Sequence, residues 1–94
     1  MFIRVTRGRF DPARFDEFHQ LVDDVATAVR RLPGLQSLMD GVDRARGQMI
    51  AVSTWDTEEH ARWSAAALGG DFPSRLQALG VQLDPPEFFE ATTT

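Results

Sequence analysis

The sequence predicts an α+β domain in which one antiparallel sheet carries two helices on one face. Three observations favour this class: an alternating apolar and polar segment at the start of the chain, two strand-like runs joined by a short glycine-bearing connection, and two segments with helical periodicity that separate the strand-like runs. The chain has 94 residues, less than one typical domain, so residues 1–94 are assigned to a single domain.

The first strand and the first helix are predicted from residues 2–34. Residues 2–10 alternate as a strand does, and Asp11 can accept hydrogen bonds from the free amides of a following helix that begins at Pro12. That helix carries an apolar stripe at steps of three and four residues: Phe15, Phe18, Val22, Val25, Val29 and Leu32. Leu-Pro-Gly at 32–34 ends the helix, because proline lacks an amide proton and glycine readily adopts a left-handed cap.

Two strand-like runs follow, at 35–42 and 48–55, and the connection at 43–47 contains a glycine. Their length and rough alternation predict an antiparallel hairpin. Both parities of the second run are rich in apolar residues. A sheet solvated on one side should instead alternate cleanly with polar residues, so we expect both faces of this sheet to be covered.

A second helix is expected to begin at Asp56 or Thr57 and to continue to about Leu68, where two glycines break it. The sequence also predicts a further short helical segment at residues 71–79. The last strand, 81–91, contains two consecutive prolines, which cannot donate to a ladder and therefore mark an edge, a bulge or a bend.

The resulting order is β-α-β-β-α-β, the ferredoxin-like arrangement, with a four-stranded antiparallel sheet and both helices on one face. This arrangement leaves the other face of the sheet uncovered. Because the third strand is apolar on both parities, we expect a second copy of the chain to cover that face and form a homodimer.

The composition excludes several classes of function. The net charge of −4 argues against a nucleic-acid binder, and Lys, Cys, Asn and Tyr are absent, which excludes disulfides, thiolate chemistry and Schiff-base lysines. We see no metal-ligand spacing, no signal peptide and no membrane span, and we expect a cytoplasmic protein without a cofactor.

Three features together are typical of a known family: the amphipathic helix that ends in Leu-Pro-Gly, the hairpin, and the segment Ser-Thr-Trp-Asp-Thr-Glu-Glu-His-Ala at 53–61. With these features the chain resembles, over nearly its whole length, the antibiotic biosynthesis monooxygenase group of dimeric α/β barrel proteins. The resemblance implies a homodimer with a hydrophobic cleft in each subunit between helices and sheet. Some members of this group are cofactor-free oxygenases of polyphenolic substrates, and others bind and degrade haem.

The chain departs from both branches of the group. The haem-degrading branch uses an asparagine, a tryptophan and a histidine; Trp55 matches the tryptophan, but the chain has no asparagine, and Ala65 stands about where the histidine would fall. The oxygenase branch commonly places Asn, Trp and Tyr in its cleft, of which only the tryptophan is present here.

His19 and Trp55 are the main candidates for a functional site. Trp55 can wall a cleft and stack on a flat ligand, or it can simply pack under the second helix. His19 borders the apolar stripe, where it can act as a base toward a phenol, or it can remain an exposed histidine paired with Asp23. The other predicted cleft residues are Phe15, Phe18, Val22, Met49, Trp63, Phe72 and Arg4, of which Arg4 could steady an anionic group.

Three functions remain open from the sequence. The first is a cleft for a flat aromatic or polyphenolic molecule in a cofactor-free monooxygenase, and the second is a non-catalytic ligand-binding or stress-associated dimer, which the missing Asn and Tyr favour. The third is a haem-binding protein with His19 or His60 as axial ligand.

Overall fold

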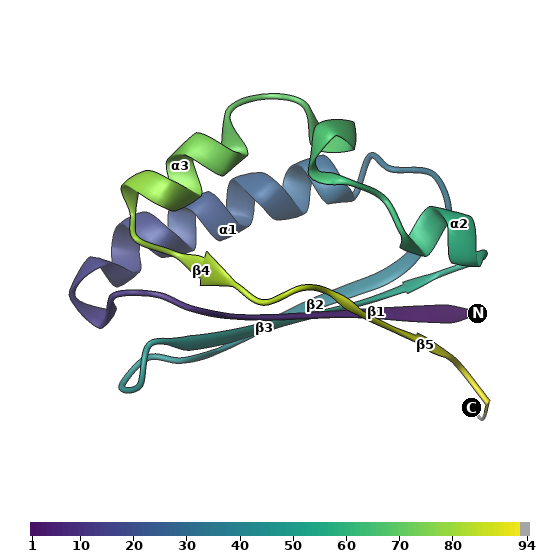
Figure 1. Ribbon diagram of the computed structural model, residues 1–94, viewed down its shortest axis with the longest axis horizontal. Helices are drawn as coiled ribbons and strands as arrows, with labels where there is room; N and C mark the ends of the chain where they lie inside the picture. Colours follow the sequence, from purple (N-terminus) through teal and green to yellow (C-terminus); the bar gives the residue numbers. More distant parts are fainter. Residues whose placement is uncertain (93–94) are drawn as a thin grey trace.

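The computed structural model describes residues 1–92, and its sheet runs in the order β2-β3-β1-β4, with β5 also paired to β1. The central strand β1 (Phe2–Arg9) lies antiparallel to β3 (Gln48–Trp55), which pairs with β2 (Leu35–Asp43) in the predicted hairpin. Figure 1 shows every helix on the same side of this sheet. The predicted ferredoxin-like α+β fold is confirmed.

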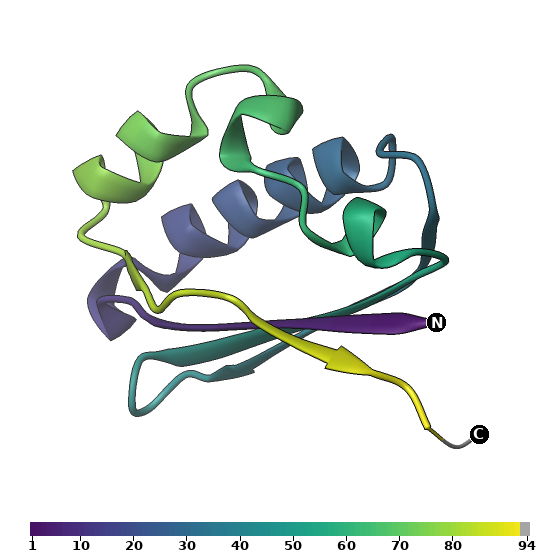
Figure 2. The ribbon, with the colours of Figure 1, turned by 45° about the vertical axis from the view of Figure 1, so that its right-hand side comes forward.

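The last predicted strand is divided, as its two prolines indicated. It forms β4 (Gln82–Leu83) and β5 (Glu87–Glu90), and both pieces pair with β1. Pro85 and Pro86 lie between them, where the missing amide protons interrupt the ladder. Because of this bend, β4 and β5 lie along two successive parts of β1 (Figure 2).

The first helix begins as predicted. A 3₁₀ turn, η1 (Pro12–Arg14), leads into α1 (Phe15–Val29), and the Asp11 carboxylate accepts a hydrogen bond from the amide of Ala13 at 3.0 Å. The buried residues of α1 are Phe18, Leu21, Ala26 and Val29, which face the sheet. The helix therefore forms the roof of the space above β1 and β3 (Figure 1).

The second helix differs from its prediction, because it is broken after one turn. Its observed parts are α2 (Glu58–Ala61), the 3₁₀ turn η2 (Ala65–Leu68) and α3 (Phe72–Ala78). The Thr57 side chain caps α2 by accepting a hydrogen bond from the His60 amide at 3.1 Å, one of the two predicted caps.

The break has an identifiable cause on β1. Nη1 of Arg4 donates to the carbonyl oxygens of Ala61 at 3.1 Å and Trp63 at 2.7 Å. In a continuous helix these two carbonyls would accept from amides four residues further along the chain. The Arg4 side chain therefore caps the end of α2 from a strand 57 residues away in sequence.

The core beside this break centres on Val29, Trp55 and Ala61, and the last two are fully buried. Phe2, Leu35 and other partly buried residues pack around them. Among residues 1–92, none of the helices could span a lipid bilayer.

Candidate functional site

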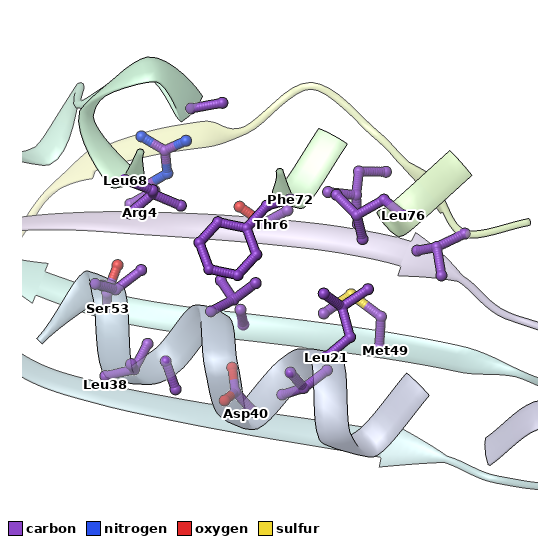
Figure 3. Close-up of a pocket in the computed structure, with 18 of the residues that line it drawn as sticks. Arg4, Thr6, Leu21, Leu38, Asp40, Met49, Ser53, Leu68, Phe72 and Leu76 are labelled. Carbon is purple, nitrogen blue, oxygen red and sulfur yellow. The ribbon is translucent and has the colours of Figure 1, made fainter. Parts of the chain in front are cut away.

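A cavity of about 210 Å³ lies between α1, α3 and the helix-covered face of the sheet. Its wall is largely apolar, with contributions from α1 (Phe18, Leu21, Val22, Val25, Ala26, Val29), from the α2–α3 region (Trp63, Ala65, Leu68, Phe72, Pro73, Leu76) and from the strands (Leu38, Met49, Ala51, Leu83). The polar residues in the wall are Arg4, Thr6, Asp40 and Ser53. Figure 3 shows Arg4, Ser53 and Leu68 toward one end and Met49 and Leu76 toward the other.

The size of the cavity limits the ligand. An apolar void of about 150 Å³ already binds benzene, and pockets for drug-sized ligands begin at about 300 Å³. The cavity lies between these limits. It therefore suits a flat molecule of about one or two fused rings.

The pleat of the strands explains why four polar residues reach the cavity. Arg4 lies opposite Ser53, and Thr6 lies opposite Ala51, which in turn lies opposite Asp40 on β2. Side chains alternate between the two faces of a sheet, so these residues share the face that α1 covers. The register thus brings one cation, one carboxylate and two hydroxyls to one apolar chamber.

Asp40 is the acidic group of the cavity wall, and its environment is unusual for a carboxylate. Partial desolvation raises the pKa of Asp40 above its ordinary value; the carboxylate of Asp23 adds to this effect, and Arg30 opposes it. Asp40 keeps contact with solvent, and a raised pKa makes its carboxylate a better proton acceptor than a carboxylate at the ordinary value. Asp40 is therefore the candidate base of the cavity.

Asp40 was missed by the sequence analysis. It was detectable as the acidic member of a strand parity that otherwise carries Leu38 and Val42. Thr6 and Ser53 were missed as well, because a hydroxyl in a strand carries little signal until the pairing register is known.

Ser53 is held in place by Trp55. The indole Nε1–H of Trp55 donates to Oγ of Ser53 at 2.8 Å, and Ser53 itself is buried. The expectation that Trp55 walls the cleft is corrected, because this residue lies in the core behind the cavity wall, packed with Val29 and Ala61. Trp55 thus acts on the cavity through Ser53.

Six of the predicted cleft residues line the cavity: Arg4, Phe18, Val22, Met49, Trp63 and Phe72. Phe15 does not, because it lies one turn before Phe18 and packs instead against Phe10 and beneath the guanidinium of Arg44, 4.0 Å from its ring centroid. The apolar stripe of α1 thus begins outside the cavity and enters it at Phe18.

His19, the predicted base, lies outside the cavity. Its ring stacks on Phe15 with the centroids 5.6 Å apart, and its Nδ1 lies 3.9 Å from a carboxylate oxygen of Asp23. The side chain is 60% exposed, so the structure does not bring this imidazole to a ligand in the cavity. The physical reason is its position on α1, which turns the ring past the edge of the apolar stripe.

His60 also lies away from the cavity. Its Nδ1 is 2.7 Å from Oδ1 of Asp56, and this hydrogen bond lowers the pKa of the Asp56 carboxyl. Neither histidine can therefore serve as an axial ligand to a group bound in the cavity. Within residues 1–92 there is also no cluster of three or more His, Asp or Glu side chains that could hold a metal ion.

The fold matches several solved structures along nearly its whole length. A protein from Deinococcus radiodurans described as an antibiotic biosynthesis monooxygenase has a TM-score of 0.80 at 18% identity, covering 100% of this chain and 95% of that one. SnoaB, a cofactor-independent oxygenase from Streptomyces nogalater, has a TM-score of 0.74 at 20% identity, covering 99% and 94%. The chain has the fold of the antibiotic biosynthesis monooxygenases.

HapK from Hahella chejuensis has the same fold as this chain, with a TM-score of 0.68 at 18% identity, covering 100% of this chain and 95% of that one. No family model matches the sequence, and no curated protein matches it. The likeness to antibiotic biosynthesis monooxygenases is therefore one of fold, and the chemistry must be argued from the cavity itself.

Proposed function

We propose that this chain binds a flat phenolic molecule in the cavity and oxygenates it without a cofactor. The observation that carries the proposal is the apolar chamber of about 210 Å³ with the Asp40 carboxylate in its wall. The match in fold to SnoaB, a cofactor-independent oxygenase, supports this reaction class. The role of base passes from His19, which the sequence suggested, to Asp40.

In this mechanism Asp40 accepts the proton of a phenolic hydroxyl. The resulting phenolate carries negative charge on a ring carbon, and this electron-rich carbon reacts with dioxygen to form a C–O bond. The apolar wall excludes water from the oxygenated intermediate and holds the ring in one orientation. Arg4 and Ser53 lie away from Asp40 in the cavity wall, where they can hold a polar substituent of the ligand.

The balance of the reaction is clear for 1-naphthol, whose two fused rings suit the cavity. Dioxygen adds at the ring carbon para to the hydroxyl, and the hydroperoxide loses water to leave a second carbonyl. One oxygen atom enters the product, 1,4-naphthoquinone, and the other leaves as water with the two hydrogens of the substrate. The substrate itself supplies all four electrons that reduce dioxygen, so no external reductant is required.

The test is turnover of 1-naphthol in buffer equilibrated with ¹⁸O₂, followed by mass spectrometry of the quinone. Wild-type protein should introduce one ¹⁸O atom per product, and Asp40→Asn should lower the rate by at least about 100-fold, the lower range for loss of a general base. His19→Ala is the matched control, because His19 is exposed, and its rate should remain unchanged. Equal rates for wild type and Asp40→Asn would remove Asp40 as the base.

A non-catalytic ligand-binding role is the second candidate. Among the residues that line the cavity, Asp40 is the one carboxylate, and there is no histidine to assist it. Saturable binding of 1-naphthol without ¹⁸O incorporation would support this role instead of the oxygenase.

The proposed assembly is a homodimer that uses the sheet face opposite the helices. This face carries Ile3, Val5, Met39, Ile50, Val52 and Phe89, and two of these residues remain largely exposed: Met39 at 75% and Phe89 at 52%. Contiguous exposed apolar surface of this kind is typical of protein interfaces. Sedimentation should give about twice the chain mass of 10.5 kDa.

A further inference from the structure

Arg4 is fixed rigidly at one end of the cavity. Its Nη1 donates to the carbonyls of Ala61 and Trp63, and the guanidinium carbon lies 3.9 Å from the centroid of the Trp63 ring. Stacking and two hydrogen bonds leave this side chain little freedom. A ligand at this end would therefore meet a planar cation that is already in position.

The positive charge of Arg4 has no carboxylate partner among residues 1–92. Other arginines form ion pairs, including Arg7 with Glu87 and Arg62 with Glu58, but no carboxylate within residues 1–92 pairs with Arg4. Desolvation lowers the pKa of Arg4 to about 10, so it remains protonated at neutral pH. The cavity thus holds a desolvated cation without a counter-ion.

A second guanidinium, that of Arg62, adds to this positive field. The guanidinium of Arg62 lies 4.2 Å from the centroid of Phe88, and that of Arg4 lies 5.5 Å from the same centroid. Two cations therefore share one aromatic ring at this end of the chamber. Arg62 is paired with Glu58, whereas Arg4 has no carboxylate partner in the part of the chain that the structure describes.

Two buried donors at the same place lack acceptors. Nε of Arg4 and Nε1 of Trp63 are buried, and neither has a hydrogen-bond partner within residues 1–92. Buried donors in native proteins nearly always have a partner, so each orphan requires an explanation. Both atoms belong to cavity-lining residues that stack on each other, so the polar groups at this end of the cavity are short of acceptors within residues 1–92. Because these two atoms are themselves closed to solvent, a ligand in the cavity would contact the rest of the Arg4 guanidinium.

We propose that the ligand of this cavity is an aromatic acid whose carboxylate binds the Arg4 guanidinium; the inference rests on the proposed function and names its substrate class. The carboxylate supplies the counter-ion that Arg4 lacks within residues 1–92. Planar Arg–carboxylate pairs are among the strongest charge-assisted hydrogen bonds. Figure 3 shows Arg4 at the end of the cavity where this group would lie.

Asp40 sets the second requirement on the ligand. In the sheet, Arg4 and Asp40 are separated by two strand spacings and two residue rises, which places their Cα atoms about 12 Å apart. Both residues line the cavity, so a molecule of two fused rings with a substituent at each end can span the distance between them. The ligand therefore carries its acid group at the Arg4 end and a hydroxyl toward Asp40.

Calorimetric titration with 2-naphthoate and 2-naphthamide tests the proposal at pH 7. The two probes have the same rings and nearly the same shape, but only the first carries a charge. Wild type should bind 2-naphthoate at least about tenfold more tightly than 2-naphthamide, the effect expected of one charge-assisted contact. Equal affinities would overturn the proposal and leave the aromatic cavity intact, whereas failure of both probes to bind would overturn the proposed function as well.

Two variants locate the effect. Arg4→Met keeps an unbranched apolar side chain, so it should reduce the preference to about unity while 2-naphthamide still binds. Arg7→Met is the matched control: Arg7 lies on the same strand but on the opposite face, and the preference should remain. A preference that survives Arg4→Met would overturn the proposal. Arg4 also caps α2, so Arg4→Met could fail to fold. In that case the ratio of the wild-type affinities for 2-naphthoate and 2-naphthamide decides the proposal alone.

Discussion

The two faces of the sheet each carry some side chains that their surroundings do not suggest. The face beneath α1 and α3 is covered, yet it carries the polar side chains Arg4, Thr6, Asp40 and Ser53. The other face has no helix over it within residues 1–92, yet it presents a row of aliphatic side chains. Polar groups usually face solvent and apolar groups the interior. We therefore propose the covered face as a ligand site and the open face as an interface.

Each face accounts for a different part of the proposal. Polar groups in a covered cavity cost desolvation energy, which is recovered only when a ligand or the protein supplies partners. Aliphatic groups on an open face are exposed to water, and the unfavourable free energy of this exposure is removed only when another surface covers them. Separate substitutions should therefore disturb assembly and ligand binding independently.

The largest effect is expected from Val52→Arg on the open face. Val52 lies in the middle of β3, opposite Val5 on one side and Met39 on the other. An unpaired buried charge costs about 3–5 kcal/mol, so the dimer should dissociate at least about 100-fold more readily. Sedimentation equilibrium would then give the mass of one chain.

Val42→Arg is the matched control for this substitution. Val42 pairs with Met49 on the helix-covered side, at the end of the sheet, and it is already 46% exposed. This variant should keep the mass of the wild-type protein. A wild-type chain that sediments as a monomer, or a Val52→Arg variant that remains dimeric, would contradict the assignment of the open face as an interface.

A smaller effect is expected from replacing either tryptophan on the covered side, and the loss of stability should differ between the two. Trp55→Phe removes the hydrogen bond to Ser53 and leaves its buried Oγ unpaired, so the free energy of unfolding should fall by about 1–3 kcal/mol. Trp63→Phe removes an indole N–H that has no partner, and the loss of stability should be smaller by about 1 kcal/mol or more. Urea denaturation of the two variants measures both values. Equal losses would show that the hydrogen bond from Trp55 contributes nothing to stability.

The sequence predicted the features that depend on residues close together in the chain and missed those that depend on residues far apart in the chain. The hairpin, the cap at Asp11 and the interruption by Pro85 and Pro86 could be predicted, because each depends on residues that are neighbours in the chain. The break after α2 could not, because its cause is Arg4, 57 residues away from Ala61. Local pattern alone favoured a continuous helix to Leu68, and a long-range hydrogen bond overrode it.

The same distinction explains the site residues. The apolar periodicity of α1 identified Phe18 and Val22, which line the cavity, but it could not show where the cavity begins, and so Phe15 and His19 were included. Asp40 enters the site only through its register with Ala51 on β3. Such pairings fix which polar residues converge, and they cannot be derived from the spacing within one strand.

The smallest expected effect tests the electrostatic cost of Asp40 in the covered face. A carboxyl with a pKa raised in the folded state binds its proton more tightly when folded than when unfolded, so this group lowers stability as the pH rises through and above its unfolded pKa, ordinarily about 3.9. Asp40→Asn should remove this penalty. Because the residue keeps contact with solvent, the gain at pH 7 should be within about 0.5 kcal/mol.

Urea denaturation of wild type and Asp40→Asn at pH 3 and pH 7 measures this effect. The stability of the variant relative to wild type should be greater at pH 7 than at pH 3, since Asp40 is protonated in both states of the wild type at the lower pH. Asp56→Asn provides a contrast of opposite sign, because its hydrogen bond with His60 lowers the pKa of that carboxyl and ionisation there stabilises the fold. If both variants shifted in the same direction with pH, the desolvation of Asp40 by the cavity wall could not be the cause, and Asp40 would lose its standing as the base of the covered face.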